Sequence, residues 1–357
     1  MLAAIDRLAD DLRAELRALS LSGPRARAAT RTALAAVLAA LTALALHLEN
    51  PWWAAITAVV IVQAAATATL GRSIERAAGT TIGAGIGYLA SATVADHLLF
   101  LIIIGSCTAF VIYAQERAEH GYAFLLGGVT IVLIMFGSLA IPGAALHLAV
   151  YRALEIYVGV IAACIVDIAL AESNAHSAAY KPGVWTPPID LELAVIAVTG
   201  GITISLIPLI WETLELPGLG QTPITAFVIL NALRQEPNWK ALTRAAGCLL
   251  GGLYGLAAMH VVGDAFVLWL IAFAVGVYAA AHIGQGGGDA SYVGLQAGVA
   301  IVIAMVQGQA PSPDISPAVN RLIGVFGGVI IVSICQPLLV PLISWAVRLR
   351  EWTSDTT

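Results

Sequence analysis

Long apolar runs separated by short polar or Pro/Gly-rich breaks dominate the hydropathy pattern of this sequence. A bilayer core about 30 Å thick needs roughly 20 apolar residues per helix, and runs of about this length recur along the chain. They predict about twelve transmembrane helices, near residues 32–48, 52–71, 77–95, 97–115, 121–141, 148–171, 191–210, 221–234, 241–262, 264–283, 290–308 and 317–346. We therefore expect an all-α integral membrane protein.

The segments outside the apolar runs are short. Leucines recur at helical spacing among charged residues in 1–24, which predicts an amphipathic helix on the cytoplasmic membrane surface. Residues 172–190 are Pro-rich and predict a cytoplasmic linker, and 347–357 predict a cytoplasmic tail. The eighth span is short because Arg234, Glu236 and Pro237 interrupt its apolar run, so we expect a broken or tilted helix there.

Composition and charge exclude several classes of protein. Hydrophobic residues make up 59% of the chain and charged residues only 11%, which is far outside the range of soluble domains. The net charge is −5 and no basic stripe is present, so nucleic acid is not an expected partner. The cysteines and histidines lack metal-ligand spacing and no nucleotide-binding motif occurs, so we expect no metal, no cofactor and no enzyme activity.

The positions of Lys and Arg predict the orientation of the chain. With twelve spans, every Lys and Arg except Arg152 and Arg321 falls on one side of the membrane, which the positive-inside rule makes the cytoplasmic side. Both termini then lie in the cytoplasm of a multi-pass protein of the bacterial inner membrane.

An internal repeat relates the two halves of the chain at an offset of about 169 residues. Arg76, Gly79 and Gly83 return as Arg244, Gly247 and Gly251, and further matches follow upstream and downstream. We expect two parallel six-helix repeats, 25–171 and 191–346, related by a pseudo-two-fold axis along the membrane normal. The repeated glycines at every fourth position predict close helix packing rather than a ligand site.

Residues 51–89 resemble the signature of the fusaric acid resistance and aromatic acid exporter family, which is similar to that of the plant aluminium-activated malate transporters. The shared elements are Trp53-Ala54, Thr57, Val59-Val60, Arg72, Arg76, Gly79-Thr80 and Gly83. The resemblance implies an inner-membrane efflux or anion-conducting protein, with six-helix units paired around a central pathway. It also implies a small organic anion and a periplasmic adaptor protein as partners, besides the lipid bilayer and further copies of the pseudo-dimer.

Arg152 and Arg321 are the principal candidates for a binding site. An Arg near the membrane centre costs about 2.5–3.5 kcal/mol on insertion scales, yet one occurs at the same place in each half. Two such guanidinium groups near one axis can bind a carboxylate bidentately. The alternative is that both arginines snorkel toward the outer interface.

Other polar residues within or beside the spans give weaker candidates. Glu155 lies on the same helix face as Arg152 and either forms an ion pair with it or couples transport to protons. Asp167, on the same predicted helix, is a second coupling candidate. The repeat-related pairs are substrate-binding candidates that also have ordinary roles, in orientation or in helix–helix hydrogen bonding: Arg76 with Arg244, and Gln63 with Asn231.

These observations predict a transporter that exports organic, specifically aromatic, carboxylates and is driven by the proton motive force. A passive anion channel would use the same arginines. A non-transporting membrane scaffold subunit would instead leave them facing lipid or loops.

Overall fold

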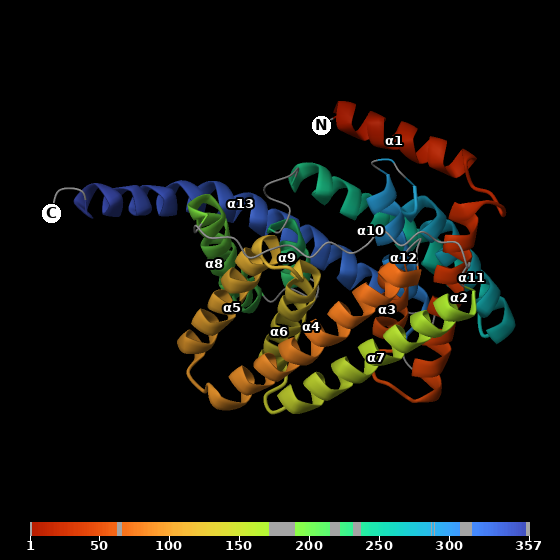
Figure 1. Ribbon diagram of the computed structural model, residues 1–357, viewed down its shortest axis with the longest axis horizontal. Helices are drawn as coiled ribbons and strands as arrows, with labels where there is room; N and C mark the ends of the chain where they lie inside the picture. The colour runs from red at the N-terminus through yellow and green to blue at the C-terminus, as the bar shows by residue number, and fades with distance from the viewer. Residues whose placement is uncertain are drawn as a thin grey trace. The chain divides into compact units, whose positions relative to one another are not determined.

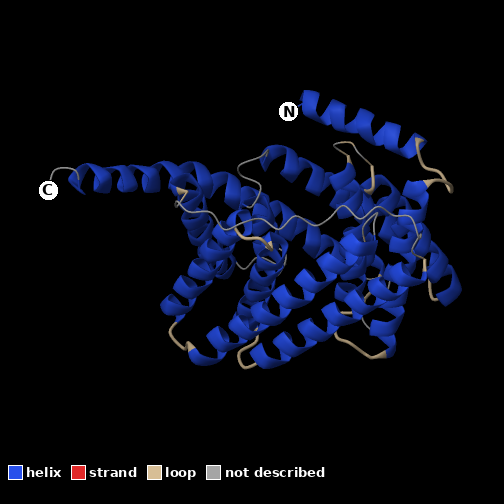
Figure 2. Ribbon diagram, viewed as in Figure 1, coloured by secondary structure: helices blue, strands red, loops and turns tan. Residues whose placement is uncertain are grey.

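The computed structural model describes residues 2–62, 66–170, 190–214, 222–230, 237–286, 288, 290–307 and 316–354. Within these ranges the chain forms thirteen α-helices and no strand (Figures 1 and 2). The helices are α1 (Leu2–Arg17), α2 (Pro24–Ala45), α3 (Trp52–Ile61), α4 (Ala66–Thr93), α5 (His97–Arg117), α6 (Gly121–Ala140), α7 (Ala145–Ala169), α8 (Leu191–Leu214), α9 (Thr222–Leu230), α10 (Pro237–Val262), α11 (Phe266–Gly284), α12 (Ser291–Met305) and α13 (Ser316–Ser354). The all-α fold that the apolar runs predict is confirmed.

Eight of the described helices are long and apolar enough to cross a membrane: α2, α5, α6, α7, α8, α10, α11 and α13. Two further apolar helices, α3 and α12, have 10 and 15 residues. At 1.5 Å per residue α3 is about 15 Å long, half the thickness of a bilayer core. The chain is thus a multi-pass membrane protein, whereas the total of twelve spans stays a prediction.

The predicted second span, 52–71, is wrong as a single helix. α3 ends at Ile61, Val62 is extended with φ −64° and ψ 123°, and residues from Ala66 onward belong to α4. No Gly or Pro marks the break, but Val59 through Val62 are four consecutive β-branched residues, whose restricted side chains lower helix propensity. α4 thus begins eleven residues before the start of the predicted third span.

The short eighth span corresponds to α9, which has only nine residues, and 231–236 lie outside the described residues. α10 then begins at Pro237, a position where proline suits a helix because the first N–H groups have no intrahelical partner. α1 occupies 2–17 of the segment 1–24, whose place on the cytoplasmic membrane surface stays a prediction. The predicted linker 172–190 lies outside the described residues except for Asp190. α13 continues to Ser354 through most of the segment predicted as a tail.

The chain forms two compact units that each take helices from both predicted halves. Unit 1 comprises Met1–Ala77, Tyr151–Lys181 and Asn238–Leu322, and unit 2 comprises Ala78–Val150, Pro182–Pro237 and Ile323–Thr357. In unit 1, α2 packs against α11 and α3 packs against α12; in unit 2, α5 packs against α8 and α6 packs against α9. The parallel repeat and its axis stay predictions.

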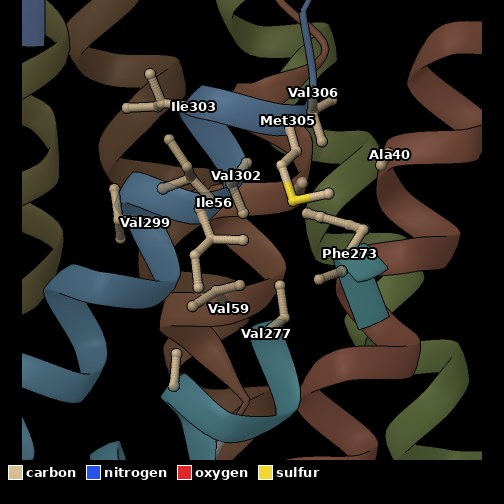
Figure 3. Packing of buried hydrophobic residues seen from close by; sticks show 14 of the residues in the cluster. Ala40, Ile56, Val59, Phe273, Val277, Val299, Val302, Ile303, Met305 and Val306 are labelled. Carbon is tan, nitrogen blue, oxygen red and sulfur yellow. The ribbon is translucent and has the colours of Figure 1, made fainter. Parts of the chain in front are cut away.

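α3 lies at the centre of unit 1 and is buried on both of its sides. One side, with Ile56 and Val59, packs into a cluster built from α2, α10, α11 and α12, including Phe273 and Met305 (Figure 3). The other side, with Ala58, packs against alanines of α2 and α7. This helix therefore carries its side chains into protein rather than lipid.

The glycines repeated at every fourth position do pack helices closely. In unit 2, a Cβ at Gly83 would lie 2.4 Å from the backbone oxygen of Gly127 in α6. In unit 1, a Cβ at Gly251 would lie 2.2 Å from the backbone oxygen of Ala297 in α12. Gly85, on another face of α4, has nothing within 4 Å of such a Cβ. The packing role expected for these glycines is confirmed.

Candidate functional site

Arg152 belongs to α7, and its side chain contacts the first turn of α3. Its guanidinium carbon is 3.3 Å from the centre of the Trp53 ring, a cation–π contact. Its Nη1 is 3.9 Å from the Glu155 carboxylate, so the predicted ion pair is present. Glu155 also accepts a hydrogen bond of 2.9 Å from the backbone N–H of Asn50. Arg152 is 6% exposed and Glu155 1%, so the pair is held inside the protein.

A close approach of α7 to α3 positions this pair. A Cβ at Gly159 would lie 2.3 Å from the backbone oxygen of Ala54 and 2.7 Å from the Thr57 side chain. Only a residue without a side chain leaves room for the two helices at this separation. The predicted repeat partner, Gly328 of unit 2, lies in the same way against α9, where a Cβ would be 2.8 Å from the backbone oxygen of Thr222.

Arg76 joins the same region of unit 1. Its guanidinium donates a hydrogen bond of 3.2 Å to the hydroxyl of Thr57, one turn along α3 from Trp53, and its side chain is buried. Arg76 and Arg152 thus contact α3 at residues four apart, Thr57 and Trp53. The structure therefore brings together two of the predicted binding arginines, and both contact residues of the signature.

Arg244 is also in unit 1, on α10, and its partners come from α12. It donates hydrogen bonds of 3.1 Å to the side-chain oxygen of Gln296 and 3.4 Å to the hydroxyl of Tyr292. Lys240, one turn earlier, places its ammonium 4.9 Å from the centre of the Tyr292 ring. Tyr292 thus contacts two cations, Arg244 at its hydroxyl and Lys240 over its ring.

Asp167 forms a buried ion pair with Arg31. In the sequence analysis Arg31 counted only as one of the cytoplasmic Lys and Arg residues. Arg31 of α2 donates a hydrogen bond of 2.9 Å to Asp167 Oδ1, and both residues belong to unit 1. Arg31 is 9% exposed and Asp167 2%. The pair joins α2 to α7, a structural role that stands beside the coupling role predicted for Asp167.

Three predicted site residues have no described side chain. Gln63 and Asn231 lie outside the described residues, and Arg321 is within α13 although its side chain is not described. Within the described part of the chain, no group of three or more His, Cys, Asp or Glu side chains is placed to hold a metal ion.

Sequence reasoning missed the residues that partner the arginines. Trp53 and Thr57 were visible in the family signature, and Tyr292 in the repeat, where it matches Tyr122. Nothing in the sequence pointed to the contact of Asn50 with Glu155. Around Arg152 these partners bring a buried cation, a carboxylate and an aromatic face together, and Arg244 with Tyr292 forms a separate group between α10 and α12.

Comparisons with known proteins relate the chain to two families and to a group of efflux pump subunits. Residues 25–180 match the fusaric acid resistance protein family, and residues 202–335 match the fusaric acid resistance protein-like family. Similar relatives include the p-hydroxybenzoic acid efflux pump subunit AaeB of Musicola paradisiaca (27% identity) and those of Edwardsiella ictaluri and Escherichia coli K12 (31% each). Each alignment covers 41–42% of this chain and 24–25% of the relative, so the chain matches about a quarter of each relative's length. No solved structure matches the chain.

Proposed function

Because the chain belongs to the fusaric acid resistance protein family, we propose that it exports organic carboxylates, specifically aromatic ones, across the bacterial inner membrane. The observation that carries the proposal is the similarity to p-hydroxybenzoic acid efflux pump subunits. Eight apolar helices long enough to span a membrane support a transport role. Cytoplasmic termini, a periplasmic adaptor protein and use of the proton motive force belong to the same proposal.

The proposed anion site is centred on Arg152. Its guanidinium offers a fork of N–H donors that matches a carboxylate, and the Trp53 face beside it suits a ligand with an aromatic ring. Its predicted repeat partner, Arg321, would provide a second guanidinium in unit 1. The other proposed members of this site are Arg76, Gln63 and Asn231, and Arg244, whose partners lie on α12, is a proposed binding residue outside it.

Glu155 is the proposed link to protons. While ionised, it offsets the charge of Arg152 at 3.9 Å and competes with a carboxylate ligand for that arginine. Protonation of Glu155 removes this competition, so the protonation state of Glu155 controls whether Arg152 is available to the anion. Asp167 is the second proposed coupling residue, although Arg31 already holds it.

Flux of labelled p-hydroxybenzoate in liposomes containing the purified chain tests the proposal. We expect saturable flux that an imposed proton gradient accelerates. The E155Q variant leaves Arg152 buried without its carboxylate, so it is compared at equal amounts of folded protein, and it should retain flux while losing this response. Empty liposomes give the background rate.

Two outcomes would replace the proposal. Flux and ionic current that ignore the proton gradient in the wild-type chain would indicate a passive anion channel. Flux equal to that of empty liposomes would indicate a scaffold subunit.

A further inference from the structure

A cavity of about 240 Å³ lies in unit 1 at the opposite end of α3 from Arg152. Its volume is several times the roughly 30 Å³ of one water molecule and below the roughly 300–1,000 Å³ of pockets for drug-sized ligands. Residues from α2, α3, α4, α11 and α12 line it, with Val59, Val62 and Leu295 providing apolar wall. A molecule with a single aromatic ring is the class of ligand that this space suits.

Positive charge gathers at this cavity. Arg72 of α4 lines it, and Tyr292 forms part of its wall. Behind Tyr292 lie Arg244, which donates to the phenol oxygen, and Lys240, which lies over the ring. None of the described residues that line the cavity is Asp or Glu.

A carboxylate of α1 beside the cavity is held by another cation. Glu15 of α1 lies against Gly286, next to the lining residue Gln285. The Glu15 carboxylate accepts a hydrogen bond from Arg25. Arg25 also donates a 2.9 Å hydrogen bond to the backbone oxygen of His282. Among the described residues that line the cavity, Arg72 is the one with a formal charge, and much of the remaining wall is apolar.

We propose that this cavity is a second binding site for an aromatic monocarboxylate, with Arg72 on the carboxylate and the ring held between Tyr292 and the apolar wall. The inference rests on the proposed function and adds a second binding site for the exported anion. Trp53 at the first turn of α3 marks the Arg152 site, and Val59 and Val62 at its end mark the cavity. These markers are six to nine residues apart, so at 1.5 Å per residue the two sites lie about 9–14 Å apart along α3. In the predicted orientation the cavity lies nearer the cytoplasm, where an exported anion is loaded.

Protection of an introduced cysteine tests the site in the full-length chain. Ser291 lines the cavity, so S291C should react with a small maleimide, and saturating benzoate should slow this reaction severalfold. Benzamide, which has the same ring and no charge, should not slow it. The wild-type chain, with its four native cysteines, gives the background labelling.

The variant Arg72→Gln should weaken binding of p-hydroxybenzoate about tenfold and abolish the protection of S291C, because a charge-assisted hydrogen bond is lost. Arg13→Gln removes an exposed cation of α1 that is paired with Asp10. It should leave both the affinity for p-hydroxybenzoate and the protection of S291C unchanged. Unchanged labelling of S291C in benzoate, with wild-type affinity in Arg72→Gln, would overturn this site while leaving the proposed function intact. A wild-type chain that binds no carboxylate would overturn the proposed function and this site with it.

Discussion

The double variant R152Q/E155Q is expected to fold and to lose about 10- to 100-fold in p-hydroxybenzoate flux. Hydrogen bonds to a charged group contribute about 1.5–3 kcal/mol, and each 1.4 kcal/mol is a factor of ten. Both positions are changed because Glu155 is 1% exposed and would be left buried without its cation in R152Q alone. Loss of one partner of a buried pair costs about 3–5 kcal/mol, which would confuse lost stability with lost binding.

Two matched variants make this result specific. Arg152→Lys keeps the charge but loses the planar fork and its stacking on Trp53, so its flux should fall between wild type and the double variant. Arg13→Gln removes an exposed cation and should retain wild-type flux. Wild-type flux in R152Q/E155Q, with intact insertion in the membrane, would refute the assignment of the site to Arg152.

Asp167→Asn is expected to destabilise the protein by about 3–5 kcal/mol, because it leaves the guanidinium of Arg31 buried without its carboxylate. The thermal unfolding midpoint of the protein in detergent should therefore fall. Replacing both members with apolar residues of similar size, as in R31M/D167L, should recover most of the loss, since neither charge is then buried.

The same variants separate the two roles of Asp167. If it mainly joins α2 to α7, R31M/D167L should retain proton-responsive flux. If Asp167→Asn instead unfolds at the wild-type midpoint, the ion pair contributes nothing to stability and the structural interpretation is wrong.

Much of the helical pattern was predictable from the sequence, because lipid-facing and buried helices both require long apolar runs. Pairing of Arg152 with Glu155 was predictable as well, since residues three apart share a helix face. The glycine spacing of α4 and α10 indicated close packing, and the structure has it at Gly83 and Gly251.

The break after α3 was not predictable by hydropathy, because the apolar run continues past Val62 without a Gly or Pro. The pair of Arg31 with Asp167 spans 136 positions and depends on tertiary packing of α2 on α7. Likewise, a sequence repeat relates equivalent helices but does not say which helices pack together. Units that mix both halves, and the cavity at Tyr292, therefore became visible only in the structure.

The central claim is that this chain binds aromatic carboxylates through their charge, and equilibrium binding to the purified protein tests it most directly. Labelled p-hydroxybenzoate should bind saturably, unlabelled benzoate should displace it, and benzamide should not. Absence of saturable binding, or equal displacement by benzamide, would contradict the claim.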